Sequence, residues 1–214
     1  MHLILIFGAL ASLFLTLFVA NTFARWKAEA ARTYFIGLLK WHCPPEDDTV
    51  MDVDEAFGFM DSRGVKRVAP KGLRSDGVSV GQLLRIPIIG LIVALIIHGD
   101  PFRGPFRPGG VIHDGLYALA KAMSYWRALL SRERAEADRV IREAALCTRV
   151  LVDGKFVERK PAKVLDAAIV WAALRIGGFK AWADDGSKAQ QSLAGMAANH
   201  VAALAAIAPD LHIA

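Results

Sequence analysis

The sequence has few cysteines, the residues that cross-link a small fold through disulfides or zinc. It contains two cysteines, Cys43 and Cys147, which lie far apart and form no C-x-x-C pair. This pattern indicates neither a disulfide framework nor a structural zinc site, and leaves room for one disulfide at most. There is no internal repeat, and the only biased stretch is an alanine-rich tail. A chain of 214 residues therefore offers one domain of ordinary size plus extensions.

Charged residues are absent from residues 3–24. A helix of this length spans roughly 33 Å, enough for a hydrocarbon core of about 30 Å, so the segment predicts a transmembrane anchor over residues 1–24. The alternative is a cleaved signal peptide, because the segment ends in the small residue Ala24. No Lys or Arg precedes the apolar run, which is also long for a signal, so we favour an uncleaved anchor.

Basic residues follow this segment directly, at Arg25, Lys27 and Arg32. In a host inner membrane, the positive-inside rule would keep the bulk of the chain on the cytoplasmic side; a virion membrane is the other location considered. The whole chain is 54% hydrophobic and mildly basic, with formal charge +5 and pI about 9.4. That balance suits anionic lipid or nucleic acid. Because the basic residues are scattered and no recognition motif occurs, we expect a lipid bilayer as partner and no nucleic acid.

Aromatic and basic residues are interspersed in the next segment. Residues 25–45 predict a juxtamembrane amphipathic helix, whose membrane-interface residues would be Trp26, Tyr34, Phe35 and Trp41. An ordinary surface helix packed on the domain would show the same pattern. Residues 46–64 then predict an acidic linker, because they begin with a run of acids that lacks the central Gly and terminal Glu of a calcium loop.

The rest of the chain predicts a mainly helical α+β domain with short β-hairpins, over residues 65–183. A strand is expected at 65–69 and a tight hairpin around Asp153-Gly154. Helices are expected at 111–126, at 132–148, and from Pro161 to Gly177-Gly178. The apolar run 86–97 is too short to span a membrane and predicts a buried or membrane-dipping segment. Residues 184–214 predict an alanine-rich helix.

Two of these helices carry apolar stripes at helical spacing, and the stripe of the first is expected to be its inner face. In the helix at 132–148 the stripe is Ala137, Val140, Ile141, Ala144 and Ala145. In the helix that follows Pro161 one side carries Leu165, Ile169, Ala172 and Ile176.

The best candidate for chemistry is His113-Asp114-Gly115-Leu116-Tyr117, which opens an apolar helical run after the break Arg107-Pro108-Gly109-Gly110. At 3.6 residues per turn, His113 and Tyr117 lie one turn apart on one face, and Asp114 points about 100° away. An adjacent His and Asp can serve as base and metal ligand, or as two metal ligands. The alternative is a half-buried His beside an Asp that the helix macrodipole favours.

Four motifs occur in a fixed order. Residues 70–80 read Pro-x-Gly-x-x-Ser-Asp-Gly-x-Ser-Val, residues 113–117 read His-Asp-x-Leu-Tyr, Ala137-Asp138 lies in the next helix, and Gly177-Gly178 ends the last. Together they resemble a family widespread in tailed phages and prophages (domain of unknown function one-three-five-three), over about residues 65–182. Gly81 stands where the family usually has Pro. The resemblance implies a phage or prophage protein, whose further partners would be other phage structural proteins or copies of itself.

The His-Asp-x-x-Tyr pattern, followed by a helix bearing Asp138, is also similar to the phospholipase A-two site, especially the parvovirus capsid form. That resemblance implies that His113 is the base that deprotonates a water and that Asp114 holds calcium. It also implies that Asp138 orients His113 and that Tyr117 braces Asp138. Calcium would polarise the ester carbonyl. The Gly-rich calcium loop of that family is missing at its usual distance before His113.

Two further functions remain open. A metal phosphohydrolase of the His…His-Asp…Asp type would take its ligands from His98, His113, Asp114 and either Asp138 or Asp166. A non-catalytic membrane or virion component would use His113, Tyr117 and Asp138 only as a buried hydrogen-bonded network. We favour the structural component and keep the lipid hydrolase as the alternative. We expect the side chains of His113 and Asp138 to lie within hydrogen-bonding distance and to face an open groove near the membrane side. Burial of both in an apolar core without a cleft would contradict the hydrolase.

Overall fold

The computed structural model describes residues 2–46, 50–75, 104–122 and 127–183 of the chain. Its helices over these ranges are α1 (His2–Ala30), α3 (Arg107–Ala122), α4 (Arg127–Leu146) and α5 (Val164–Ala183). Its strands are β1 (Tyr34–Ile36), β2 (Trp41–His42), β3 (Met51–Val53), β4 (Phe57–Met60), β5 (Lys66–Ala69), β6 (Arg74–Ser75), β7 (Arg149–Val152) and β8 (Lys155–Glu158). The predicted α+β class, with an apolar helix at the N-terminus, is confirmed.

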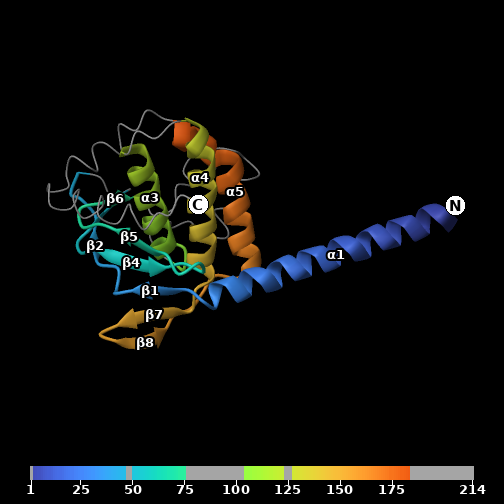
Figure 1. The fold of residues 1–214 in the computed structure, drawn as a ribbon, viewed down its shortest axis with the longest axis horizontal. Helices are drawn as coiled ribbons and strands as arrows, with labels where there is room; N and C mark the ends of the chain where they lie inside the picture. Colours follow the sequence, from blue (N-terminus) through green and yellow to red (C-terminus); the bar gives the residue numbers. More distant parts are fainter. Residues whose placement is uncertain (1, 47–49, 76–103, 123–126, 184–214) are drawn as a thin grey trace.

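Most of α1 lies outside the domain and projects away from it (Figure 1). The stretch Ala9–Ala30 is long and apolar enough to cross a membrane, and only 6% of its most apolar part is buried. Large side chains on this part face outward, with Leu13 56% and Phe14 72% exposed. Ordinary soluble surfaces seldom expose a continuous apolar area of this kind.

The last turns of α1 belong to the domain. Trp26 and Ala30 are buried in a cluster formed with α4 and α5, and Phe23 packs against the same cluster. The ring of Trp26 lies 5.7 Å from that of Trp171 in α5, and Glu29 accepts a hydrogen bond of 2.6 Å from Arg142 in α4. The apolar helix is therefore joined rigidly to the folded part of the chain.

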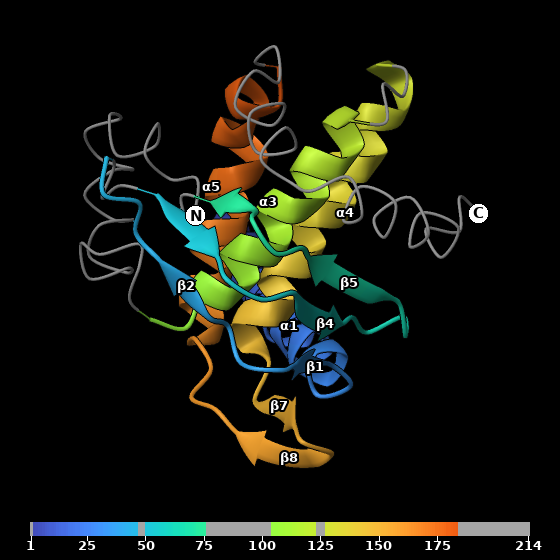
Figure 2. The same ribbon diagram turned by 90° about the vertical axis from the view of Figure 1, so that its left-hand side faces the viewer.

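β1 lies at the centre of a five-stranded sheet with the order β5-β4-β1-β7-β8 (Figure 2). It pairs antiparallel with β4 and parallel with β7, so that Phe35 faces Phe59 on one side and Val150 on the other. β2, β3 and β6 form a second, antiparallel sheet. The five-stranded sheet thus joins a segment just after α1 to a segment more than a hundred residues further along the chain.

This topology corrects the interpretation of residues 25–64. The helix expected over 25–45 ends at Ala30 and is followed by β1 and β2, and the predicted linker 46–64 contains β3 and β4. Apolar residues among the acids explain why this segment forms strands. Four of them are buried: Met51, Val53, Phe57 and Phe59. Burying them offsets the preference of the acidic residues for solvent.

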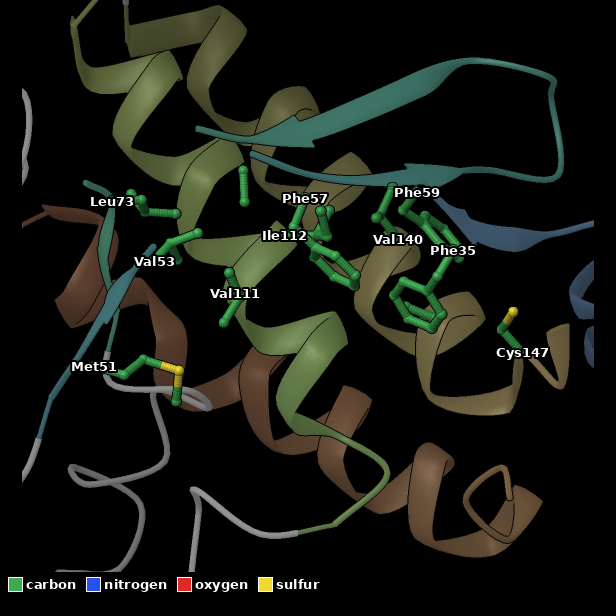
Figure 3. Close-up of a cluster of buried hydrophobic side chains, with 12 residues drawn as sticks. Phe35, Met51, Val53, Phe57, Phe59, Leu73, Val111, Ile112, Val140 and Cys147 are labelled. Atoms are coloured by element: carbon green, nitrogen blue, oxygen red, sulfur yellow. The ribbon is translucent and has the colours of Figure 1, made fainter. Parts of the chain in front are cut away.

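The main core lies between the sheets and helices α3 and α4 (Figure 3). Three aromatic residues fill its centre, with the Phe35 ring 5.3 Å from Phe57 and 5.0 Å from Phe59. A second core joins α1, α4 and α5. α4 lies between the two cores, and its predicted inner stripe is buried in full: Ala137, Val140, Ile141, Ala144 and Ala145.

α3 begins earlier than the sequence indicates. The break at residues 107–110 forms its first turn, because proline is tolerated there. Gly109 also has a packing role, since a Cβ at this position would lie 3.0 Å from the Cβ of Ala144. The lack of a side chain at Gly109 lets α3 approach α4 closely.

The expected strand at 65–69 and the hairpin at Asp153-Gly154 are confirmed as β5 and as the β7–β8 hairpin. Asp153 has a φ of 49° and Gly154 one of 75°, and two successive left-handed residues suit the twist of a tight hairpin. The segments 86–97 and 184–214, for which a buried or membrane-dipping run and a helix are expected, lie outside the described residues.

α5 differs from its prediction in two respects. It runs through Gly177-Gly178 to Ala183 instead of ending there. Its buried face is also not the side that carries Leu165, because the buried residues packed against α4 and α1 are Ala167, Val170, Ala173 and Leu174, with Val164, Ala168 and Trp171 beside them. Leu165, the first residue of the predicted stripe, is 59% exposed. A helix that is apolar on every side gives no sequence cue to which side is buried.

Candidate functional site

α3 and α4 bring His113, Tyr117 and Asp138 together as predicted. The prediction that His113 and Asp138 face an open groove is wrong, because their side chains are 1% and 0% exposed. His113 and Tyr117 lie on one face of α3 with their ring centroids 4.1 Å apart and their planes tilted by 39°. His113 Nε2 lies 3.1 Å from Asp138 Oδ1, and the Tyr117 hydroxyl donates to the same oxygen at 3.0 Å. The close contact of α3 with α4 therefore places one carboxylate oxygen between an imidazole and a phenol.

Asp114 faces the other ring nitrogen of His113 and the smaller sheet. His113 Nδ1 lies 3.3 Å from Asp114 Oδ1, and Ser75 in β6 donates a 2.6 Å hydrogen bond to Asp114 Oδ2. The role of Ser75 was not predicted, because its pairing with Asp114 depends on how β6 lies against α3. Both nitrogens of His113 thus face a carboxylate.

Two arginines complete the surroundings of Asp138. Arg175 in α5 donates to Asp138 Oδ2 at 3.1 Å, while the Nε of Arg134 lies 3.8 Å from the same oxygen. Arg134 also donates to the backbone carbonyls of Leu174 and Arg175, at 2.8 and 2.6 Å. The i,i+4 spacing of Arg134 and Asp138 is visible in the sequence, whereas nothing in the sequence indicates Arg175. The network joins β6, α3, α4 and α5.

The charge state of His113 follows from its surroundings. Its side chain is 1% exposed, and burial alone would lower its pKa, but the hydrogen bonds and charges of Asp114 and Asp138 outweigh burial and raise the pKa to about 9. His113 is therefore an imidazolium at neutral pH, with both N–H groups directed at carboxylates. A general base needs an unprotonated nitrogen within reach of a water, so His113 is held in the wrong form for that role near pH 7.

Asp138 and Tyr117 are shifted in directions that fit this assignment. Burial alone would raise the pKa of Asp138, but the hydrogen bond and charge of His113, followed by the bonds from Arg175 and Tyr117, lower it below its usual value. Burial and the neighbouring Asp138 carboxylate raise the pKa of Tyr117. The cluster consists of an ionised Asp138, a charged His113 and a neutral phenol.

Three of the predicted metal ligands lie together, but His113 pairs with both carboxylates, those of Asp114 and Asp138. Among the described residues, no group of three or more His, Cys, Asp or Glu side chains is placed to hold a metal ion. Asp166 lies in the first turn of α5, while Asp138, the other possible ligand of a phosphohydrolase, is engaged with His113, Tyr117 and Arg175. His98 lies outside the described residues. Calcium at Asp114 remains a prediction.

The predicted membrane-interface residues divide into two pairs. Trp26 is 6% exposed and Phe35 is 1% exposed, so both are core residues and the prediction that they contact lipid is wrong. Tyr34 is half-buried with its ring 5.3 Å from Phe156, and Trp41 is half-buried beneath the Arg107 guanidinium. Aromatic residues next to a membrane span also build cores, and sequence spacing does not separate the two uses.

A second ionic network, which the sequence did not reveal, joins the β4–β5 hairpin to α4. Asp61 Oδ2 accepts hydrogen bonds from Arg67 and Arg139, both 2.9 Å long. Arg139 also pairs with Glu136 and Glu143. The backbone N–H groups of residues 63 and 65 donate to the other oxygen of Asp61. This cluster holds the hairpin in place and contains no histidine.

No protein-family model, curated protein or solved structure matches the chain. The likeness to the phage family and to the phospholipase site therefore rests on the motifs themselves.

Proposed function

We propose that this protein is a membrane-anchored structural or interaction component of phage or prophage type. Its domain would lie on the cytoplasmic side of a host inner membrane, or against a virion membrane. The observation that carries the proposal is the division of α1 into an exposed apolar part and a C-terminal end that is packed in the domain core. A bilayer would cover the first part and leave the second in place.

Retention of the anchor is supported by the continuity of α1. The helix runs without a break from His2 to Ala30, so the bond after Ala24 lies inside regular helix. Phe23, just before that bond, already packs against the core. Cleavage of a leader after Ala24 would remove Phe23 from its contact with the core.

The proposed orientation rests on charge. Arg25, Lys27 and Arg32 follow the apolar stretch and are exposed, and the sequence before that stretch has no Lys or Arg. The positive-inside rule favours such an end on the cytoplasmic face.

A non-catalytic role for the His113 network is supported by its burial and charge. Asp138 is fully buried and its two oxygens are engaged by His113, Tyr117 and Arg175. A carboxylate shared among three helices acts as a cross-link of the fold. The network would then keep α3, α4 and α5 in register beside the membrane.

Cys43 offers a direct test of the anchor and its orientation, because it is exposed whereas Cys147 is buried. The full chain with an N-terminal epitope is expressed in bacteria, and spheroplasts are treated with a membrane-impermeant maleimide. We expect the epitope to stay in the membrane fraction after carbonate washing, and Cys43 to be labelled only after lysis. The Cys43→Ser variant controls for labelling elsewhere. Loss of the epitope, or labelling in intact spheroplasts, contradicts the proposal.

A phospholipid hydrolase is the second candidate, favoured by one specific observation. His113 Nε2 and the Tyr117 hydroxyl meet at the same oxygen of Asp138, which is the arrangement that the phospholipase resemblance implies. If His113 were the base, turnover should rise with pH up to about 9, where its pKa lies.

Phospholipid hydrolysis by the detergent-solubilised protein, with calcium and with chelator, separates the two candidates. The wild type is compared with His113→Ala and with Asp166→Asn, which changes a carboxylate outside the network. Calcium-dependent turnover that only His113→Ala abolishes would establish a lipid esterase. No turnover in any of the three folded proteins supports the structural role.

A further inference from the structure

α5 has a second apolar face that the domain does not use. Its inner face, described above, packs against α4 and α1. Residues 167–174 are all apolar, so two full turns of the helix offer no polar side to solvent. On the opposite side, Leu165 is 59% exposed, and Ile169 and Ala172 are only partly covered. A helix that is apolar all round is normally buried in protein or lipid.

The position of this outer face relative to α1 indicates what covers it. Figure 1 shows α5 on the side of the domain from which α1 projects, and Figure 2, viewed from the opposite side, shows it behind α3. The two helices are fixed to each other by the contact of Trp26 with Trp171. If α1 enters a bilayer, α5 is the helix of the domain that lies nearest to the membrane surface.

Charge around this face is of the sign that anionic lipid attracts. Lys160 and Lys163 are exposed in the segment that leads into α5, and Arg25 and Lys27 are exposed near the end of α1. The only acid in α5 is Asp166, which is half-buried in the first turn. An apolar strip bordered by lysines is the pattern of a helix that lies in the plane of a membrane interface.

We propose that the outer face of α5, defined by Leu165, Ile169 and Ala172, rests on the bilayer that α1 spans, with Lys160 and Lys163 against anionic headgroups. This inference rests on the proposed membrane anchor. Two helices would then hold the domain at the membrane: α1 crosses the bilayer and α5 lies along its surface. The tilt of the domain against the membrane surface is then fixed by both helices.

The test uses the full chain in liposomes made from equal parts of phosphatidylcholine and phosphatidylglycerol. In a Cys43→Ser background, a polarity-sensitive fluorophore is attached at Leu165→Cys or, as a matched control, at Val157→Cys. Val157 is also an exposed apolar residue, 52% accessible, but lies in the β7–β8 hairpin. We expect spin-labelled lipid to quench the probe at position 165 several-fold more than the probe at position 157.

The lysines provide a second readout. Each basic residue near an anionic surface contributes about a fivefold change in partitioning, so Lys160→Glu with Lys163→Glu should sharply reduce quenching at position 165. Replacing phosphatidylglycerol with phosphatidylcholine should do the same. Flotation of the liposomes reports the anchor separately, so failure of α1 to insert is distinguished from failure of α5 to dock.

Three results would overturn the proposal in a chain that floats with the liposomes. Equal quenching at positions 165 and 157 would show that α5 has no preferred contact with lipid. Cross-linking through position 165 without lipid quenching would assign the face to a second copy of the chain. A probe that is shielded equally in detergent and in liposomes, and is not quenched by lipid, would assign it to residues 184–214 of the same chain.

Discussion

Side chains of α4 take part in two buried ionic networks, and each network stabilises a buried aspartate with a different set of partners. One is centred on Asp138, which is bound by His113, Tyr117 and Arg175. The other is centred on Asp61, which is bound by Arg67 and Arg139. Both central carboxylates are almost fully buried, with Asp138 0% and Asp61 1% exposed. In each case burial would raise the pKa of the carboxyl group, and its partners outweigh this effect and lower it.

The difference lies in what the partners do as pH changes. Arginine stays charged throughout the accessible range, so the Asp61 network weakens only when acid protonates its carboxylates. His113 releases its proton near pH 9, so the Asp138 network also weakens in alkali. A buried carboxylate is stable with either partner, but only the histidine makes that stability depend on pH above neutrality.

The largest effect is expected from Asp138→Ala. The substitution leaves the buried imidazolium of His113 and the guanidinium of Arg175 without their shared anion, and breaking a buried pair in this way costs about 3 kcal/mol or more. The free energy of unfolding is measured by urea denaturation of the detergent-solubilised protein. Glu55→Gln, at an exposed salt bridge with Lys40, is the control and should change it very little. A loss below about 1 kcal/mol for Asp138→Ala would show that the network is not a structural cross-link.

Asp61→Ala should come next, with a loss of about 2 kcal/mol. The effect is smaller because Arg139 keeps Glu136 and Glu143 as partners, and Arg67 keeps Glu136. The same urea titration measures it. A loss larger than that of Asp138→Ala would reverse the proposed ranking of the two networks.

The pH dependence sharpens the comparison further. The folded protein raises the pKa of His113 from 6.5 to about 9, so its contribution is fully present below about pH 6.5 and is lost as pH rises through about 9. The urea midpoint of the wild type should therefore fall between neutral pH and about pH 10. His113→Gln should flatten this decline, whereas Asp61→Asn should leave it unchanged. A wild-type midpoint that is constant over this range would mean that His113 is neutral in the fold.

The smallest effect is expected from Glu136→Gln, at the edge of the Asp61 network. Its side chain is 22% exposed, and solvent screens the attraction to Arg67 and Arg139, so the loss should be about 1 kcal/mol or less. Combining it with Asp61→Ala tests whether the two carboxylates act as one unit. If the double variant loses more free energy of unfolding than the two single variants together, each carboxylate compensates for the loss of the other.

The sequence predicted the contacts among His113, Tyr117 and Asp138 better than it predicted the strands around them. The spacing of His113 and Tyr117, and the short connection to the helix with Asp138, are local properties that helical geometry fixes. Asp153-Gly154 likewise specified its hairpin through backbone preferences alone. β1 could not be predicted in this way, because three residues form a strand there only by pairing with β4 and with the distant β7. Arg175 was missed for the same reason, since it reaches Asp138 only after α5 packs on α4.

By itself, the sequence determined an apolar segment long enough to cross a bilayer, the helices that carry the His-Asp-x-x-Tyr motif and Asp138, and the buried stripe of α4. Each depends on periodicity or composition over neighbouring residues. Tertiary structure decided that Trp26 and Phe35 are core residues, that the acidic segment contains strands, and which face of α5 is buried. It also decided the charge of His113, because a pKa depends on burial and on carboxylates brought close by packing.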